Sequence, residues 1–410
     1  MNTQYFFYLY PNVYVSDKKQ ESILLYNTST GKQLVSNDRI FNDWVRKVYE
    51  PQNLGVIAVC KEEISRCCSS LLAEAISLNI GNVETLRTHK PVNLLPFLSL
   101  QKDFEKYDNK GEESMLGDDI ISYLSELNLF LTSNSDGDRS FLKYVHQQLP
   151  FPVFNEFEEE ELDEHAVETI LKQISYSPVK NINIFGGDLS LYKRLVLLND
   201  ILAQYNRYTF HFWSYVMDID RLLVYDNSNY CYDIIVIPKY QTNIDSIKQL
   251  IEGKLSEVKY RLHVYITSEE EYEEYARSFS HYQIEIRPLF ADNLGLFQKN
   301  IFINRCDFED TPVSMRSIFC NQKVNSNFFG QLSIYPNGDV RTTYCAELLG
   351  NIYNDKIIQL IHKELVENTS WRKVRSNNVC ERCHYQYLCP PPSLYESVIG
   401  KKNLCSIVSD

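Results

Sequence analysis

The sequence predicts an α/β protein built on a partial or complete (β/α)6 barrel, with a small α+β module before the barrel and a cysteine-rich domain after it. Three observations lead to this prediction. Strand and helix patterns alternate through the middle of the chain, which is typical of a parallel sheet with helical crossovers. The first part of the chain instead groups short strands before helices. Seven of the eleven cysteines fall between Cys306 and Cys405. We place the boundaries at residues 1–95, 96–300 and 301–410, since domains commonly have roughly 100–200 residues.

The N-terminal module, residues 1–95, begins with short strands joined by tight turns. The segment from Thr28 to Gly31 has the composition of a turn between two of them. The expected strands are residues 12–15, 23–27 and 33–35.

Two helices follow these strands. Asn37 or Asp38 can cap the first, and Pro51 ends it. The second is expected at residues 62–79, with Gly81 as its C-terminal cap.

The middle of the chain, residues 96–300, alternates strands with amphipathic helices. About six such units fit a partial or complete barrel, in which ligands bind at the carboxyl ends of the strands. The expected strands are residues 127–132, 181–185, 208–213, 232–238, 261–266 and 283–288. The expected helices are residues 163–175, 189–205, 244–257 and 268–277.

The charge and hydropathy of the chain exclude two classes of partner. The formal net charge is −13, and no basic patch interrupts it, so we expect no nucleic-acid partner. The densest charge run, residues 156–164, is acidic and is interpreted as a solvated loop and helix start. No run of 18 apolar residues occurs, and the N-terminus lacks the basic region of a signal peptide. We therefore expect no membrane partner and a cytoplasmic location.

The cysteines form the strongest chemical pattern in the chain, Cys380-x2-Cys383-x5-Cys389-x15-Cys405. An odd number of cysteines in a large chain without an export signal argues against a disulfide framework. Four thiolates can hold a [4Fe–4S] cluster or a structural zinc ion. Zinc usually recruits two close cysteine pairs, whereas the last two cysteines here are spread out. The pattern favours a cluster held by several loops, with zinc and a metal-free site as alternatives.

This region resembles the SPASM domain, the auxiliary-cluster domain of radical-SAM peptide maturases. The residues that carry the resemblance are Cys320, the segment YPNGD at 335–339, Cys345, Gly350-Asn351-Ile352, Trp371 and the four cysteines above. The family pattern has one more cysteine shortly after the position of Cys389. Here that stretch reads CPPPS, with Ser393 as the nearest polar residue.

The resemblance implies one complete and one incomplete metal site. Cys380, Cys383, Cys389 and Cys405 match the ligands of the outer auxiliary cluster, which implies one [4Fe–4S] cluster as cofactor. The missing cysteine would complete an inner cluster. Cys320 and Cys345, together with Cys306, remain as candidate ligands of that second site.

The middle of the chain resembles a radical-SAM barrel that has lost its catalytic cysteines. Radical-SAM enzymes carry CxxxCx(F/Y)C after the first barrel strand, and three thiolates there hold the cluster that cleaves S-adenosylmethionine. Ser135, Arg139 and Leu142 stand at these positions, and neither Arg nor Leu can ligate iron. We therefore expect no cleavage of S-adenosylmethionine. The alternative is that this segment is an ordinary polar loop.

A second barrel motif supports the resemblance. Gly186, Gly187 and Asp188 follow the second expected strand and resemble the GGE motif that contacts the amino group of S-adenosylmethionine in the family. Glycine permits close backbone approach, and a carboxylate can pair with an ammonium. The resemblance implies a vestigial binding motif.

The N-terminal module resembles the peptide-recognition element fused to many maturases, on the sequence ILLYNTSTGKQLV. That element binds the leader of a precursor peptide as an added strand. The resemblance implies that the edge formed by Gln33, Leu34 and Val35 binds the precursor. A generic small α+β domain is the alternative.

Taken over nearly its whole length, the chain resembles the pseudo-radical-SAM/SPASM proteins of the GG-Bacteroidales peptide system, with LCPPPSLYE and NLC as a C-terminal signature. This resemblance implies a non-catalytic protein in the maturation of a ribosomally synthesised peptide, with a precursor peptide and a radical-SAM maturase as partners. Two alternatives stay open. One is an enzyme that uses the barrel or the cluster for other chemistry or electron transfer, and the other is a zinc-stabilised structural protein.

Overall fold

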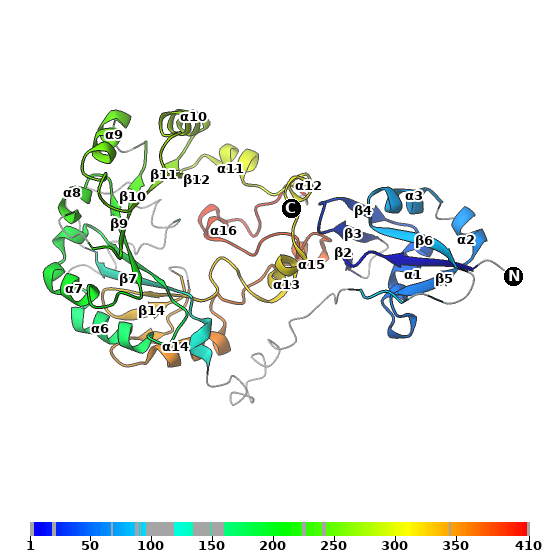
Figure 1. Cartoon of the computed structure of the whole chain (residues 1–410), viewed down its shortest axis with the longest axis horizontal. Helices are drawn as coiled ribbons and strands as arrows, with labels where there is room; N and C mark the ends of the chain where they lie inside the picture. The colour runs from blue at the N-terminus through cyan, green and yellow to red at the C-terminus, as the bar shows by residue number, and fades with distance from the viewer. Residues whose placement is uncertain are drawn as a thin grey trace.

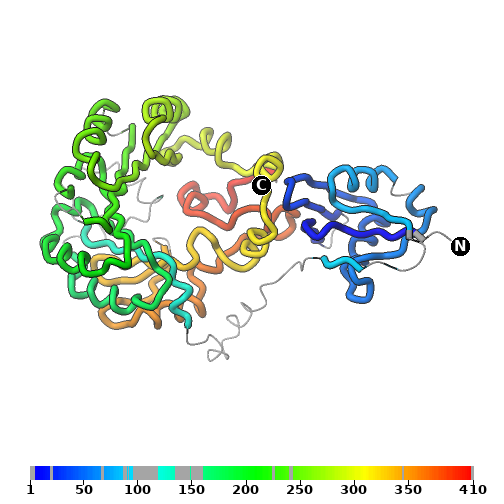
Figure 2. The backbone as a smooth tube through the Cα atoms, viewed as in Figure 1, coloured from blue at the N-terminus to red at the C-terminus, as the bar shows by residue number. Residues whose placement is uncertain are grey.

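The structure, a computed structural model, describes residues 4–18, 22–66, 69–86, 90, 92–95, 119–133, 148, 160–223, 227–239, 243–343 and 346–407. Figures 1 and 2 show the N-terminal strands at one end of the molecule and a large curved sheet at the other, with the C-terminal segment between them. The fold is of the mixed α/β kind that the sequence predicts. In the part of the chain that the structure describes, no helix is long and apolar enough to cross a membrane.

The N-terminal module contains two antiparallel three-stranded sheets, ordered β5-β1-β6 and β2-β3-β4. Side chains from both sheets and from the first helix share one core, which includes Phe7, Leu25 and Trp44. The strands are β1 (Gln4–Leu9), β2 (Val13–Asp17), β3 (Ile23–Asn27), β4 (Gln33–Ser36), β5 (Val56–Val59) and β6 (Gly81–Leu86). The helices are α1 (Arg39–Val48), the 3-10 turn η1 (Pro51–Asn53), α2 (Lys61–Arg66) and α3 (Ser69–Ser77).

The predicted elements of this module are present, with additions. Asp38 caps α1, because its side chain accepts a hydrogen bond from the backbone N–H of Phe41 at 2.8 Å. Gly81 was wrongly predicted as a helix cap. It begins β6 opposite Leu9, and the left-handed position after α3 belongs to Asn79, with φ 53°. The strands β1, β5 and β6 were not predicted. β1 is a short apolar run, which periodicity alone cannot assign.

A nine-stranded sheet forms the centre of the chain, in the order β12-β11-β10-β9-β8-β7-β13-β14-β15. β7 to β12 are parallel and lie side by side in sequence order, and β13 is parallel to β7. β14 and β15 are antiparallel additions. Within the described residues, the sheet ends at β12 and at β15. The strands are β7 (Glu126–Thr132), β8 (Asn181–Gly186), β9 (Thr209–Tyr215), β10 (Tyr230–Val236), β11 (Tyr260–Ile266), β12 (Ile284–Pro288), β13 (Gln331–Ile334), β14 (Asp339–Arg341) and β15 (Gly350–Asn351).

Helices cover the convex face of this sheet, and the C-terminal segment with α16 lies on its concave side (Figure 1). The helix predicted at residues 189–205 is shorter than expected, since a 3-10 turn capped by Asp188 precedes it. The crossover elements are η4 (Ile120–Tyr123), α6 (Glu164–Gln173), η6 (Leu189–Leu191), α7 (Leu195–Leu202), α8 (Ile219–Leu222), α9 (Ile244–Glu252), α10 (Glu269–Ser278) and α11 (Leu294–Asn300). The later helices are α12 (Asp307–Asp310), α13 (Met315–Lys323), α14 (Ile357–Glu367), α15 (Asn378–Arg382) and α16 (Leu394–Ile399).

The two faces of the sheet differ in chemistry. Alternate side chains such as Leu129 and Ile184 pack under the helices in the largest core of the molecule. The intervening side chains on the concave face are aromatic toward the carboxyl ends of the strands. Phe130 stacks between Phe185 and Tyr335, with ring centroids 4.8 and 4.9 Å apart. The concave face is therefore filled at the end where a barrel of this kind would bind its ligands.

Candidate functional site

Four cysteines that are distant in sequence line one small cavity. Cys380 lies in α15, Cys383 ends that helix, and Cys389 follows a turn. Cys405 comes from the C-terminal segment, which bridges in parallel to Ile303. All four are free thiols. The structure thus brings together the complete ligand set predicted from the sequence, with donors from three separate loops.

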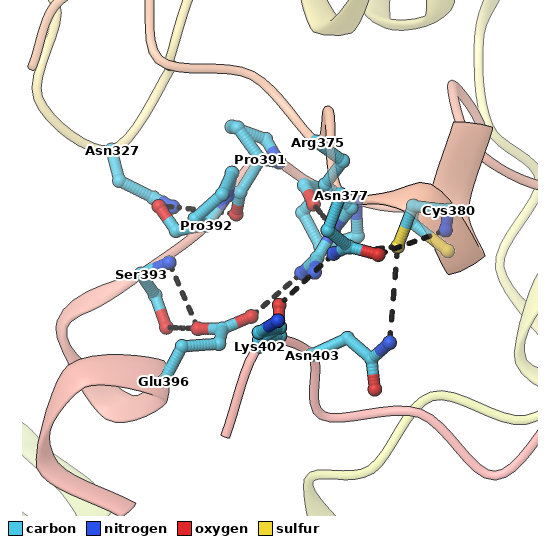
Figure 3. Close-up of polar contacts among 12 residues, drawn as sticks. Asn327, Arg375, Asn377, Cys380, Pro391, Pro392, Ser393, Glu396, Lys402 and Asn403 are labelled. Carbon is cyan, nitrogen blue, oxygen red and sulfur yellow. Dashed lines mark hydrogen bonds and ion pairs between the residues drawn. The ribbon is translucent and has the colours of Figure 1, made fainter. Parts of the chain in front are cut away.

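Nitrogen donors surround three of the four sulfurs. The side-chain amide of Asn377 donates to Sγ of Cys380 at 3.2 Å, and its oxygen caps the same residue's backbone N–H at 2.9 Å (Figure 3). The backbone N–H groups of Tyr385 and Ile407 donate to Cys383 and Cys405 at 3.4 and 3.2 Å. N–H donors favour sulfur that carries negative charge, as thiolate ligands do. The donor set therefore fits a metal centre.

A zinc ion and a cluster require different distances between the four sulfurs. In a tetrahedral zinc site with Zn–S bonds of about 2.3 Å, the sulfurs lie about 3.8 Å apart. In a [4Fe–4S] cluster each cysteine binds a different iron, so the sulfurs lie farther from one another.

Burial and nearby cations act in opposite directions on the thiols of the cavity. Burial raises the pKa of the Cys383 and Cys389 thiols, so both stay protonated at neutral pH until a metal displaces the proton. Two cations oppose this effect: Lys18 acts on Cys383, and the buried guanidinium of Arg375 acts on Cys389. The sequence analysis missed Lys18 and Arg375. They lie far from the cysteines in the chain, and nothing in the local pattern marks them.

Ser393, the polar residue nearest to the missing cysteine, has a structural role. Its backbone N–H and its hydroxyl donate to Oε2 of Glu396 at 2.9 and 2.5 Å, which forms a capping box at the start of α16. The other oxygen of Glu396 pairs with Arg375 at 2.8 Å (Figure 3). The hydroxyl is thus engaged away from the thiols. Of the candidates for a second site, Cys320 is half-buried in α13, Cys306 is exposed, and Cys345 lies outside the described residues.

The motif Gly186, Gly187 and Asp188 forms a tight structural turn. A Cβ at Gly186 would lie 2.6 Å from the end of the Leu189 side chain, which would have to move to admit it. Asp188 is fully buried, and one carboxylate oxygen accepts from the backbone and hydroxyl of Ser190 at 2.9 and 2.5 Å. The other oxygen pairs with Arg221 at 3.1 Å. This carboxylate is therefore already satisfied by the chain's own donors. Ser135, Arg139 and Leu142 lie outside the described residues.

The predicted peptide-binding edge belongs to β4, which lies at the end of its sheet. Leu34 is buried, whereas Val35 is 45% exposed. Gln33 faces the C-terminal segment, where it donates to Glu309 at 2.9 Å and accepts from the hydroxyl of Tyr385 at 2.6 Å. The side chain of Val35 is thus partly exposed to solvent at this edge, whereas the side chain of Gln33 is hydrogen-bonded within the chain.

The sheet of β2, β3 and β4 packs directly against the loop between Cys383 and Cys389. His384 contacts Ser22 at 2.8 Å and the carbonyl oxygen of Ser16 at 3.0 Å. Lys18 binds Gln386 and lies 4.6 Å from the ring centre of Tyr387. Every residue of this loop from His384 to Leu388 contacts or packs near the sheet, and Cys383 and Cys389 share its apolar cluster. The candidate metal centre and the candidate peptide-binding sheet therefore form one contact region.

A polar layer crosses the concave face of the large sheet, and the sequence analysis missed it. The strand register places Ser333, Asn128, Asn183 and His211 in one row. Next to this row, Asp233 is fully buried and accepts from His211 and His263 at 2.7 Å each. Polar residues at alternate positions of otherwise apolar strands, as in NINIF and RLHVY, were the available signal. They indicate a strand that is polar on one face.

His211, Cys231 and Asp233 satisfy the distance criterion for a metal site, but a guanidinium already occupies the cationic position. Nε of Arg261 lies 3.2 Å from Asp233, and its Nη2 lies 3.2 Å from Nε2 of His211. We therefore interpret this group as a network of ion pairs and hydrogen bonds rather than a metal site.

No known family model matches the sequence, and no curated protein does. Among solved structures, the chain is similar to Streptococcus suis SuiB, in crystal structures of SuiB bound to precursor peptide SuiA, of SuiB, and of SuiB bound to S-adenosylmethionine. The identity is 12% in each case, over 98% of this chain and 99% of SuiB, and the TM-scores are 0.43, 0.43 and 0.42. At this identity and TM-score, the similarity assigns neither a ligand nor an activity to this chain.

Proposed function

We propose that this protein is a non-catalytic, radical-SAM-like component of a peptide-maturation system. In this proposal, residues 1–95 bind a precursor peptide, residues 96–300 form a degenerate barrel, and residues 301–410 hold one [4Fe–4S] cluster on Cys380, Cys383, Cys389 and Cys405. A true radical-SAM maturase would be the catalytic partner. The supporting sequence observation is that Ser135, Arg139 and Leu142 stand where catalytic cysteines would be.

The observation that carries the proposal is the state of Asp188. A carboxylate that binds the amino group of S-adenosylmethionine has to be available to the ligand. Here it is fully buried and already bound by Ser190 and Arg221. The stacked rings of Phe130, Phe185 and Tyr335 fill the adjacent concave face. These contacts support a barrel that serves as a scaffold.

The cysteine site supports a binding role for the same scaffold. A bound cluster would supply electron transfer or structural support. The side-chain amides of Asn377 and Asn403 donate to Sγ of Cys380 at 3.2 and 3.9 Å. Arg375, in the loop before Cys380, donates to the carbonyl oxygen of Pro390 and to the carboxylate of Glu396. Because the same loop supports β2, β3 and β4, the metal would stabilise the peptide-binding sheet.

Two measurements test the proposal. The anaerobically purified, reconstituted protein is incubated with dithionite and S-adenosylmethionine, with a radical-SAM enzyme of intact CxxxCxxC motif as positive control. We expect no 5′-deoxyadenosine, and its formation would refute the non-catalytic role. Iron and sulfide analysis is expected to give about four irons per chain. About eight irons would restore the second site, and stoichiometric zinc without sulfide would favour the structural-protein alternative.

Binding of the precursor is tested with a peptide encoded near the gene. We expect saturable binding by the full chain and its loss in Val35→Pro, because proline removes a backbone donor from an edge strand. Val92→Pro, at another exposed valine, is the matched control. Equal binding by both variants would contradict docking at β4.

A further inference from the structure

A separate polar cavity of about 440 Å³ lies on the concave face of the large sheet. Its strand residues come mostly from the first half of each strand: Glu126, Asn181, His211 and Arg261 are each among the first three residues of their strand. The C-terminal segment closes it through Leu394. The stacked rings of Phe130 and Tyr335 lie farther along the strands, between the cavity and the turn at Gly186. The cavity is therefore distinct from both the vestigial motif and the cysteine site.

We propose that this cavity binds a carboxylate of a peptide, through the guanidinium groups of Arg261 and Arg287. This inference rests on the proposed role in peptide binding and names the chemistry of a second contact. It concerns a part of the peptide other than the segment that would add to β4.

Two guanidinium groups face the cavity, and each already has a carboxylate partner. Arg261 pairs with Asp233 at 3.2 Å, and Arg287 pairs with Glu285 at 2.5 Å. A guanidinium has five N–H groups. Arg261 uses Nε toward Asp233 and Nη2 toward His211, and Arg287 uses Nη2 toward Glu285, so Nη1 of each arginine can donate to a ligand. His211 adds a third cation, since burial lowers its pKa but its bonds to Asp233 and Cys231 outweigh burial and raise it to about 9. Glu126 is a third carboxylate at the cavity, so three cations face three carboxylates, and a ligand carboxylate would be recognised by N–H groups of the two guanidiniums rather than by an excess of positive charge.

The remaining walls suit a peptide rather than a bare anion. Phe185 and Trp213 stack at 5.4 Å and form an apolar wall. The side chains of Asn181 and Thr343 also line the cavity, and they can pair with peptide groups. The volume is in the range of sites for small ligands, roughly 300–1,000 Å³.

Short synthetic peptides test the inference on the full, metal-loaded chain by calorimetric titration. The probes are trialanine with a free C-terminus, its amide, an acetylated and amidated Ala-Glu-Ala, and inorganic phosphate. We expect binding of at least one carboxylate probe and none of trialanine amide, which has no carboxylate. Binding of free trialanine would identify a C-terminal carboxylate, and binding of Ala-Glu-Ala would identify a side chain. Absence of carboxylate binding, or tighter binding of phosphate, would overturn the proposal.

Matched variants assign the contact. Arg261→Gln and Arg287→Gln should each weaken carboxylate binding at least tenfold, whereas Lys172→Gln, which removes one exposed charge on the outer layer, should leave it unchanged. If a Gln variant does not fold, Arg287→Lys is used instead. This variant keeps the positive charge but loses the planar set of guanidinium donors, and we expect it to bind the carboxylate several-fold more weakly. Equal affinity in all folded variants would refute the site. Precursor binding at β4 is measured in the same variants. The Gln variants should retain this binding even if the carboxylate site is wrong, so its loss in the unmodified protein would instead count against the proposed function.

Discussion

At the scale of single residues, the contacts of Asp188 indicate that the motif from Gly186 to Asp188 is a structural turn rather than a ligand site. Its contacts with Ser190 and Arg221 hold the 3-10 turn after β8. Asp188→Asn keeps most of the shape but loses the ion pair, and we expect a loss of unfolding free energy of about 1–2 kcal/mol, since the partner Arg221 is half exposed. Chemical denaturation measures this, with the exposed Asp200→Asn as control. An unchanged stability combined with weaker binding of S-adenosylmethionine would reverse the interpretation.

His211 makes the stability of the fold dependent on pH. Burial lowers its pKa, but the hydrogen bond and charge of Asp233 outweigh this effect and raise the pKa to about 9. Because the pKa of His211 is higher in the folded state than the unfolded value of about 6.5, protonation of His211 stabilises the folded state, and this stabilisation is complete below pH 6.5. This stabilisation is lost as the pH rises through about 9. The groups that face His211 are Asp233 and Cys231 on β10, Glu126 on β7 and Arg261 on β11, and Arg261 opposes the shift.

We therefore expect the unfolding free energy to fall by on the order of 1–3 kcal/mol between pH 6.5 and pH 9. Denaturant titrations across this window measure it. His211→Gln should flatten the dependence, while His165→Gln, at an exposed position, should preserve it. The same slope in all three proteins would show that other groups cause it.

At the scale of elements, the turn between β3 and β4 connects the N-terminal sheet to the C-terminal half. Gly31 has φ 74°, and a Cβ there would lie 2.5 Å from the carbonyl oxygen of Phe308. The hydroxyl of Tyr26 on β3 joins this turn to the segment after α12. It donates to the carbonyl oxygen of Phe308 at 2.8 Å and accepts from the backbone N–H of Val313 at 2.8 Å. The turn therefore needs glycine both for its backbone conformation and for its contact.

A matched pair of glycine variants separates these two needs. Gly400 has a similar φ of 73°, but a Cβ there meets no atom within 4 Å. Gly400→Ala should cost about 1 kcal/mol from backbone strain alone. We expect Gly31→Ala to cost more and to reduce hydrogen-exchange protection in residues 308–313 and 384–387. Equal costs and unchanged protection would show that the sheet does not dock there.

At the scale of the whole molecule, the metal centre should control how the N-terminal module is held. The loop from His384 to Tyr387 touches the module on one side and is flanked by Cys383 and Cys389 on the other. Removal of the metal should loosen this loop, because ligands in a small loop-rich region contribute folding energy through the metal. Cys383→Ala should lower the iron content, make residues 320–410 sensitive to protease, and increase the radius of gyration in X-ray scattering. Cys60→Ala, an exposed thiol in the N-terminal module, is the control and should change none of these. A compact, protease-resistant Cys383→Ala protein would refute the coupling.

The sequence by itself determined the local elements and predicted which four cysteines come together. β3 at Ile23–Asn27, the cap at Asp38 and the βα alternation follow from short-range patterns, because a helix or strand is stabilised by residues close in the chain. The spacing of the four cysteines predicted a shared site, since pairs of thiols on short loops can reach one metal.

Only the tertiary structure decided what surrounds these elements. The row of Ser333, Asn128, Asn183 and His211 joins strands far apart in the chain, and its members meet because the register of parallel strands places them opposite one another. Lys18 reaches the cysteine loop only because β2 packs on it. From the sequence, Asp188 is predicted to contact S-adenosylmethionine. Its ion pair with Arg221 forms only when two separate segments of the chain fold together. Such contacts depend on long-range packing, which no local pattern encodes.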